Sequence, residues 1–137
     1  MPRRTFAAFP SSVPAAREWV TELLGQAPAQ LCQTAALLVS ELATNVVRHA
    51  GTPQFVVDVE FTGADGRLWV GVTDTGAGLP VPRTPDVTAE HGRGLQLVAS
   101  LADRWGAQRR RSTREKTVWF ELNDPPTAGP RPGRPPG

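Results

Sequence analysis

The segment Arg67–Asp74 alternates apolar with polar or small residues, which is typical of a β-strand with one buried face. Leu68, Val70 and Val72 occupy one phase of this alternation, and Asp74 falls in the same phase. A carboxylate that points toward the buried side of a sheet costs several kcal/mol unless a hydrogen-bond donor pairs with it. The segment therefore predicts a strand whose last residue needs a donor on the buried side.

Two glycines, Gly76 and Gly78, follow Asp74 at once. Glycine suits backbone that must bend sharply or lie against a ligand. A ligand with an amino-bearing heterocycle would satisfy both the carboxylate and the glycines. A polar strand end followed by an ordinary turn would explain the same residues, so this segment alone leaves both interpretations open.

The chain has 137 residues, which is enough for one domain with a sizeable core. We expect residues 1–123 to form this domain. From Asp124 onward the sequence is mostly proline, glycine and arginine, and it contains no large apolar residue. This composition predicts that residues 124–137 form a disordered tail.

The periodicity along the chain predicts a fold that combines helices with a sheet. The expected elements are a strand at Thr5–Phe9, a helix from Ser12 to Leu24, a longer helix from Pro28 to Ala50, strands at Gln54–Phe61 and Arg67–Asp74, a loop from Gly76 to His91, a helix from Gly92 to Arg104, and strands at Trp105–Arg111 and Thr117–Leu122. The hairpins favour a mixed, mostly antiparallel sheet with the helices on one face. The expected architecture is an α/β two-layer sandwich.

The ends and the buried faces of the first two helices can also be predicted. Ser12 is expected to cap the first helix, with Pro14 in its first turn, and Gly51 to cap the end of the second. The second helix has an apolar stripe at helical spacing that includes Leu38 and Leu42. This stripe predicts which side of the helix packs against the sheet.

Charge and cysteine content exclude several classes of protein. The formal net charge is only +2, and the arginines of the folded part cluster at residues 109–111 and Arg114 without the interleaved aromatic residues of a single-strand binder. Cys32 is the only cysteine, which excludes a disulfide framework and a thiolate metal cluster. The N-terminal sequence lacks the apolar run of a signal peptide, and no apolar stretch reaches the roughly 20 residues of a membrane span. We expect a cytoplasmic protein that binds neither nucleic acid nor membrane.

The second helix carries Glu41, Asn45 and His49 at successive four-residue steps, so that they share a face, with Arg48 beside them. The amide oxygen of Asn45 can ligate Mg²⁺, a cation that prefers oxygen. Glu41 can accept a proton from an attacking hydroxyl or water. A solvated polar face would explain the same residues, and His49 would then be an ordinary surface histidine.

The segment Gly92-Arg93-Gly94-Leu95 stands where the third helix is expected to begin. Glycines at a helix start expose backbone amides, and the helix dipole adds positive potential, so that such a start can bind phosphate. The same short pattern is also common as a simple helix cap. The lysine-bearing Walker loop and the glycine fingerprint of a Rossmann fold are both absent, so neither of those nucleotide sites is expected.

Three segments, taken together and in this order, resemble the motifs of the Bergerat-fold (GHKL-type) ATP-binding domains, the group shared by gyrase, heat-shock chaperones, histidine kinases and mismatch-repair ATPases. Glu41–Ala50 resembles the N box, Asp74–Pro80 the first glycine box, and His91–Leu95 the second. The short length and the segment Val39–Ala50 are similar to one branch, the anti-sigma factor serine/threonine-protein kinases of bacterial partner-switching systems, in their actinobacterial type. The resemblance covers about Phe9 to Leu122.

The resemblance implies a Bergerat fold that binds ATP together with Mg²⁺. Asp74 would accept a hydrogen bond from the adenine amino group, and Gly76 and Gly78 would let the chain pass close to the base. Asn45 would hold Mg²⁺ on the phosphates. Glu41 would be the catalytic general base toward a serine or threonine hydroxyl of a protein substrate.

The resemblance also assigns the phosphate contacts. The backbone amides of Arg93, Gly94 and Leu95, which follow Gly92, would cradle the β- and γ-phosphates. The loop Val81–His91 would be an ATP lid.

One part of the chain departs from the family pattern. The family often has a Gly-Thr pair at the start of the last strand, and the threonine hydroxyl supports the adenine. This chain has Glu115-Lys116-Thr117-Val118 there. Either Thr117 serves, or the pairing is shifted by one residue.

The resemblance further implies a kinase that phosphorylates a serine or threonine of an anti-anti-sigma antagonist of the STAS type and that, in another state, binds a sigma factor. Two other functions stay open. One is a nucleotide-dependent protein-binding switch without kinase activity, and Glu41 argues against it because a switch does not need a base. The other is a detached catalytic domain of a histidine kinase, which would need a partner that supplies the histidine.

A homodimer is a further expectation. Trp69, Trp119 and Val56 alternate away from the core-facing residues, so the helix-free face of the sheet is predicted to carry an apolar patch. The resembling kinases often dimerise, which agrees with a second copy on this patch. The alternative is that the N-terminal strand covers the same face.

Overall fold

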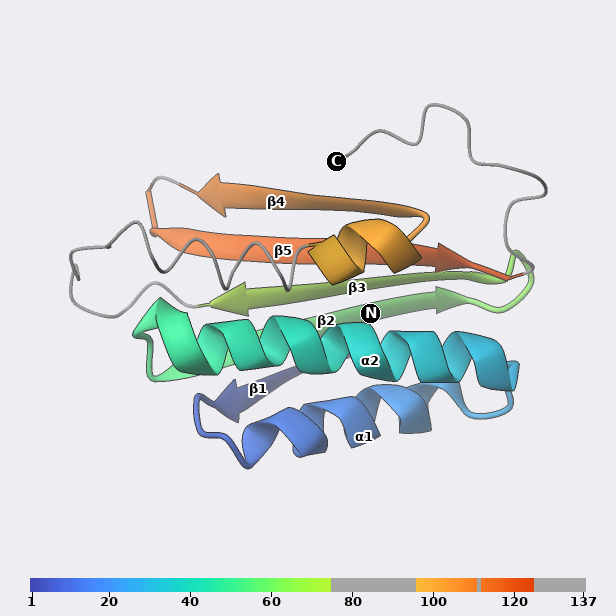
Figure 1. The fold of residues 1–137 in the computed structure, drawn as a ribbon, viewed down its shortest axis with the longest axis horizontal. Coiled ribbons are helices and arrows are strands. Elements are labelled where there is room, and N and C mark those ends of the chain that lie inside the picture. The colour runs from blue at the N-terminus through green and yellow to red at the C-terminus, as the bar shows by residue number, and fades with distance from the viewer. Residues whose placement is uncertain (75–95, 111, 125–137) are drawn as a thin grey trace.

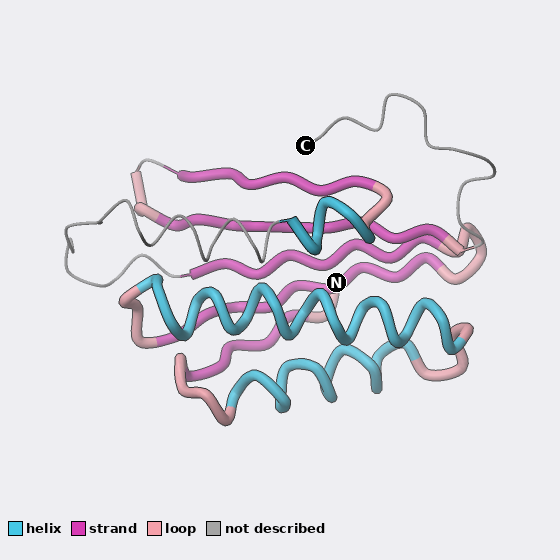
Figure 2. The backbone as a smooth tube through the Cα atoms, in the orientation of Figure 1, coloured by secondary structure: helices cyan, strands magenta, loops and turns pink. Residues whose placement is uncertain are grey.

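The computed structural model describes residues 1–74, 96–110 and 112–124, which form two layers (Figures 1 and 2). One layer is a five-stranded sheet, and the helices of the other layer lie on one face of it. Residues 96–101 are helical and belong to this second layer. The other elements are β1 (Arg3–Ala7), α1 (Ser12–Leu24), α2 (Ala29–Asn45), the π-helical turn η1 (Val46–Ala50), β2 (Gln54–Thr62), β3 (Arg67–Asp74), β4 (Arg104–Arg110) and β5 (Glu115–Asn123).

The strand order in the sheet is β1-β2-β3-β5-β4. The expected two-layer α/β sandwich is therefore confirmed. Each neighbouring pair of these strands is antiparallel, so the parallel pairs of a mixed sheet do not occur among the described strands. The predicted hairpin between β2 and β3 is present, and its turn contains Gly66 with a φ of 65°.

The core lies between the sheet and the helices, where the sequence periodicity placed it. On β3, Leu68, Val70 and Val72 are each at most 2% exposed. On α2, Leu38 and Leu42 of the predicted apolar stripe are equally buried. The two-residue period of the strand and the helical period of α2 therefore meet at one apolar interface, which sets the side of the sheet that α2 covers.

The predicted helix ends are partly correct. Ser12 is the first residue of α1 rather than its cap, and the preceding Ser11 makes no side-chain capping bond. The reason is that the amides of Ser12 and Val13 donate to the carbonyls of Phe9 and Pro10, so the first turn needs no hydroxyl acceptor. Pro14 lies in the first turn as predicted.

The first strand begins and ends two residues earlier than expected. It covers Arg3–Ala7 instead of Thr5–Phe9, because β2 begins at Gln54 and offers no partner beyond Ala7. Phe6 faces the core, where its ring stacks on Phe55 at a centroid distance of 5.5 Å. Phe9 is 63% exposed.

Several predicted segments lie outside the described residues. They are the loop from Gly76 to His91, the start of the third helix at Gly92, and the tail beyond Asp124. Among the helices that the structure describes, none combines the length and apolar character needed to cross a membrane.

Candidate functional site

The end of α2 and the end of β3 lie at the same end of the sandwich, on the face of the sheet that the helices cover (Figure 1). The chain itself brings these ends together. After η1, only three residues separate Ala50 from β2, and Phe55 of β2 pairs with Asp74 of β3. The regular geometry of an antiparallel strand pair thus places Asp74 close to the segment that follows Asn45.

Glu41 and Asn45 lie one turn apart on the last part of α2, and both side chains are half-buried. Asn45 is the last α-helical residue. Positions four residues apart on a helix are surface neighbours. A carboxylate and an amide in this arrangement can therefore act on the same ligand at the end of α2.

The sequence predicted that this helix continues to Ala50. In the structure the α-helix ends at Asn45, and a π-helical turn follows. The change begins at two consecutive β-branched residues, Val46 and Val47, which have a lower α-helix propensity. This turn carries His49, which is half-buried, and it ends at Gly51, whose left-handed φ of 69° confirms the predicted cap. Such turns are frequent at functional sites.

Asp74 is the last residue of β3, and its position confirms the phase predicted from the sequence. It follows the buried Val72 by two residues, so its half-buried side chain lies on the helix-covered face. In the sheet it stands between Phe55 of β2 and Lys116 of β5. A carboxylate at this place can accept a hydrogen bond from a ligand that lies between the end of α2 and the sheet.

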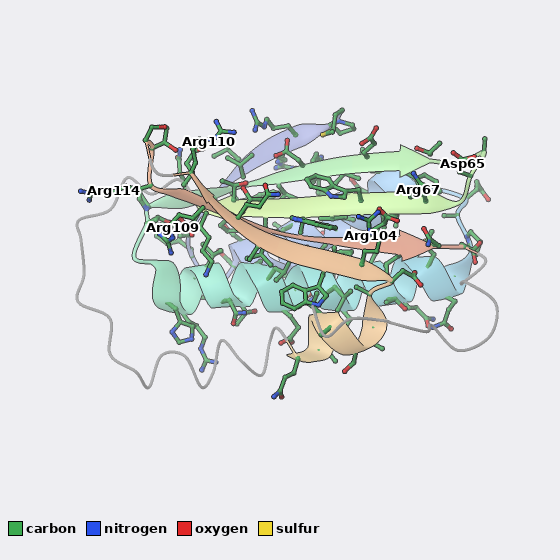
Figure 3. The ribbon with its side chains drawn as sticks, turned by 90° about the horizontal axis from the view of Figure 1, so that it is seen from above. Asp65, Arg67, Arg104, Arg109, Arg110 and Arg114 are labelled. Atoms are coloured by element: carbon green, nitrogen blue, oxygen red, sulfur yellow. The ribbon has the colours of Figure 1, made fainter. Side chains whose placement is uncertain are left out.

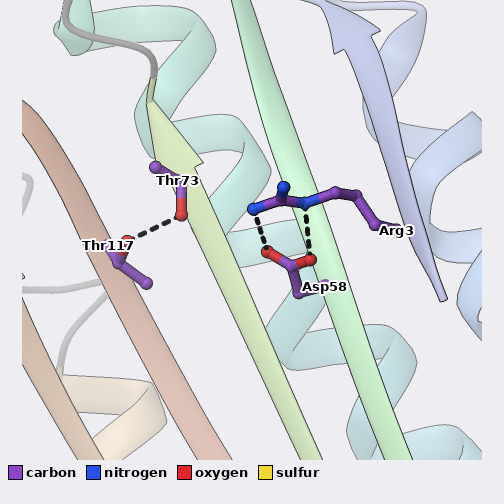
Figure 4. A network of polar contacts seen from close by, with 4 residues as sticks. All are labelled: Arg3, Asp58, Thr73 and Thr117. Atoms are coloured by element: carbon purple, nitrogen blue, oxygen red, sulfur yellow. Dashed lines mark hydrogen bonds and ion pairs between the residues drawn. The ribbon is translucent and has the colours of Figure 1, made fainter. Parts of the chain in front are cut away.

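The structure corrects the prediction for Thr117. Thr117 pairs with Thr73, and the two hydroxyl oxygens are 2.6 Å apart on the helix-free face (Figure 4). Because successive side chains of a strand point to opposite faces, Thr117 cannot share a ligand with Asp74 through its side chain. Lys116 has the position opposite Asp74 on the helix-covered face, which agrees with the alternative of a shift by one residue.

Thr117→Val is expected to lower the free energy of unfolding by about 0.5–1.5 kcal/mol, because a partly buried hydrogen bond is lost. The affinity for ATP is expected to stay within about twofold, since the hydroxyl lies on the far face. Urea denaturation and isothermal titration measure the two quantities. Thr73→Val is the matched control and should have the same two effects. A loss of ATP affinity in Thr117→Val alone would contradict the assignment of faces.

Arg109 was not expected near the site from the sequence, and Lys116 entered only as the alternative of a shift by one residue. Arg109 of β4 pairs with Lys116 of β5, which pairs with Asp74 of β3, so three charged positions form a row across the end of the sheet. Phe120 is buried, and Lys116 lies four residues before it in the same strand. The two-residue period of a strand therefore predicts that Lys116 faces the helix-covered side. Arg109 could not be placed, because its position depends on the register of β4 against β5.

The remaining predicted contacts lie outside the described residues. They are Gly76, Gly78, Gly92, Arg93, Gly94 and Leu95. The structure thus places Glu41, Asn45 and Asp74 around one end of the sandwich, and the phosphate cradle stays a prediction.

The described part of the site can be tested for its fit to a metal ion. In residues 1–74, 96–110 and 112–124, no group of three or more His, Cys, Asp and Glu side chains could hold one. Mg²⁺ commonly binds through only one or two protein oxygens, with phosphate oxygens and water as its other ligands. The half-buried amide of Asn45 fits this mode, in which a nucleotide supplies most of the ligands.

Comparison with known proteins connects this geometry to a family. Residues 6–122 match the family model of the histidine kinase-like ATPase domain. An uncharacterized protein of Streptomyces coelicolor is 38% identical over 76 residues, which make up 53% of this chain and 70% of the relative. The family match begins within β1 and ends within β5, and it therefore includes nearly all of the sandwich.

Proposed function

This chain belongs to the histidine kinase-like ATPase family, whose domain binds ATP, and we propose that it is an ATP-dependent serine/threonine protein kinase of the anti-sigma factor type. The observation that carries the proposal is the place of Asp74. A half-buried carboxylate ends β3 on the helix-covered face, beside the end of α2 that presents Glu41 and Asn45. In this proposal, Asp74 is the acceptor for the adenine base, Asn45 is the oxygen ligand of the metal ion, and Glu41 is the proton acceptor.

The adenine is proposed to lie against the end of β3, with its amino group donating to Asp74. The phosphates then extend toward the end of α2, where Asn45 is half-buried. Mg²⁺, when bound between Asn45 and the phosphates, would neutralise part of their negative charge. The amides of residues 93–95 are proposed to hold the β- and γ-phosphates.

The proposed reaction transfers the γ-phosphoryl group to a serine or threonine hydroxyl of a protein substrate. The hydroxyl oxygen forms a bond to the γ-phosphorus, and the bond between this phosphorus and the β–γ bridging oxygen breaks. Glu41 accepts the hydroxyl proton, and ADP leaves. Phosphoryl transfer requires mainly positioning and charge neutralisation, which a domain of this size can provide.

The proposed substrate is an anti-anti-sigma antagonist of the STAS type, and the proposed second partner is a sigma factor. These partners follow from the resemblance of residues 39–50 to the anti-sigma branch. A cytoplasmic location belongs to the same proposal. A homodimer stays a prediction that light scattering at micromolar concentration measures.

A nucleotide-dependent switch without kinase activity is the second candidate. The register at Lys116 supports it: if the pairing is shifted by one residue, the family's hydroxyl is replaced by a cation that stands opposite Asp74. A changed adenine contact could favour slow nucleotide release and long-lived partner binding over turnover.

Two measurements test the proposal in sequence. Isothermal titration of Mg-ATP into the full chain should give one binding site, and the absence of binding would overturn both candidates. Incubation with γ-labelled ATP and STAS-type antagonists encoded near this protein should then label a serine or threonine of one antagonist. Binding of ATP and of an antagonist without transfer of label would instead establish the switch.

A further inference from the structure

The helix-free face of the sheet carries a platform of two tryptophans. The rings of Trp69 and Trp119 are stacked with a centroid distance of 6.3 Å and an angle of 25° between their planes. Each ring lies against a glycine: a Cβ atom on Gly71 would be 2.5 Å from Trp69, and one on Gly106 would be 2.8 Å from Trp119. The absence of a Cβ atom at these glycines thus allows both rings to approach the sheet closely.

An open cavity of about 540 Å³ lies over this platform. Val56 and both tryptophans contribute apolar lining, and Thr73, Thr117, Arg110 and Glu115 are among the polar lining residues. Aromatic rings that line a shallow groove are the usual binding surface for extended proline-rich chains, because proline fits flat against a ring.

Three arginines on this face pair with carboxylates. Arg3 pairs with Asp58 at 2.8 Å (Figure 4), and Arg67 and Arg104 lie 3.8 Å and 4.0 Å from Glu121 (Figure 3). Arg110, which also lines the cavity, stands opposite Glu115 in the β4–β5 register, so arginines and carboxylates nearly balance around the tryptophans.

Glu60 has no arginine opposite it in the sheet, unlike Asp58, Glu115 and Glu121 on this face. It stands directly opposite Trp69 in the β2–β3 register, and its side chain is exposed. No ion pair involves Glu60 among the residues that the structure describes. A carboxylate therefore stands beside the aromatic platform and would favour a bound cation.

We propose that residues 125–137 of this chain bind to this face, with prolines on the tryptophan platform and an arginine beside Glu60. The segment has the sequence PPTAGPRPGRPPG, which combines prolines with Arg131 and Arg134 and contains no acidic residue. Prolines favour an extended helix that loses little entropy when it binds, and an arginine can pair with Glu60 or stack on a ring.

The connection to β5 makes this contact reachable. Asn123 ends β5, and Trp69 stands opposite Glu121, only two residues back along that strand. A chain that turns back after Asp124 has to cover roughly 15 Å, which about five residues in polyproline II geometry span at ~3.1 Å each. The segment around Arg131 can therefore lie on the platform within the same molecule.

A second copy of the chain fits the face less well. It would bring an identical surface in which Arg3, Arg67 and Arg104 are already paired and Arg110 stands opposite Glu115, so each of these arginines already lies near a carboxylate of its own copy. The segment 125–137 brings cations that are close by in the chain and prolines that suit the rings.

Nuclear magnetic resonance of the indole N–H groups in the full chain tests the proposal. The protein has four tryptophans, and substitution of each by phenylalanine assigns the four signals. The test variant combines Pro130→Gly, Arg131→Ser and Pro132→Gly in the full-length protein. The matched control changes Thr127→Ser and Ala128→Gly, which alters the same segment but no proline or arginine.

The test variant is expected to shift the signals of Trp69 and Trp119, at every protein concentration, and to leave those of Trp19 and Trp105 in place. The control should match the wild type. Glu60→Gln should lower the ratio of bound to unbound segment by up to about fivefold, as for an exposed ion pair. Unchanged signals of Trp69 and Trp119 in the test variant would overturn the proposal. Signals that move with protein concentration in wild type and variant alike would also overturn it, in favour of a second copy.

Discussion

Asp74→Asn is expected to lower the affinity for ATP by roughly 10- to 100-fold, as the loss of a hydrogen bond to a charged acceptor predicts. The side chain lies on the helix-covered face at the end of β3, where its carboxylate can accept from the adenine amino group. The amide of asparagine has nearly the same size but can present donors to that amino group. Isothermal titration with Mg-ATP measures the effect.

Asp65→Asn is the matched control for this substitution. Asp65 is an exposed residue in the turn between β2 and β3, at the end of the sheet opposite the arginines around Arg109 (Figure 3). ATP should bind this variant with wild-type affinity. If Asp74→Asn binds ATP with the same affinity as the wild type and unfolds at the same temperature, then Asp74 is not part of the binding site.

Glu41→Gln is expected to slow phosphoryl transfer to the antagonist by about 10²- to 10⁴-fold, which is the usual contribution of a positioned general base. The affinity for Mg-ATP should change by less than about threefold, because the base acts on the attacking hydroxyl and not on the nucleotide. Single-turnover transfer from γ-labelled ATP measures the rate, and titration measures the affinity.

Glu22→Gln is the matched control on the other long helix. Glu22 is exposed on α1, so the change removes a carboxylate without touching the end of α2. Transfer in this variant should proceed at the wild-type rate. Transfer at the wild-type rate in Glu41→Gln would show that another group accepts the proton or that none is needed.

The spacing of apolar residues was sufficient to predict features that depend on a single helix or strand. The bounds of β3 agree with the alternation of Leu68, Val70 and Val72, and the same alternation predicted the face of Asp74. The apolar stripe of α2 predicted its buried side, because a helical period depends only on neighbouring turns. Glu41 and Asn45 share one turn for the same reason.

The pattern failed where a residue depends on a partner that is distant in sequence. β1 was placed two residues late, because its end is set by the first residue of β2. Ser12 was assigned as a cap, although carbonyls of the preceding turn already accept the amides of the first helical turn.

The sequence alone determined the order of elements, the buried phase of Asp74, and the spacing of Glu41 and Asn45, since these follow from periods of two and 3.6 residues. Only the tertiary structure decided that Thr117 bonds to Thr73 on the far face and that Lys116 stands opposite Asp74. The physical reason is register. A slip of one residue between two strands exchanges their faces, and register is set by the packing of the whole sheet rather than by either strand.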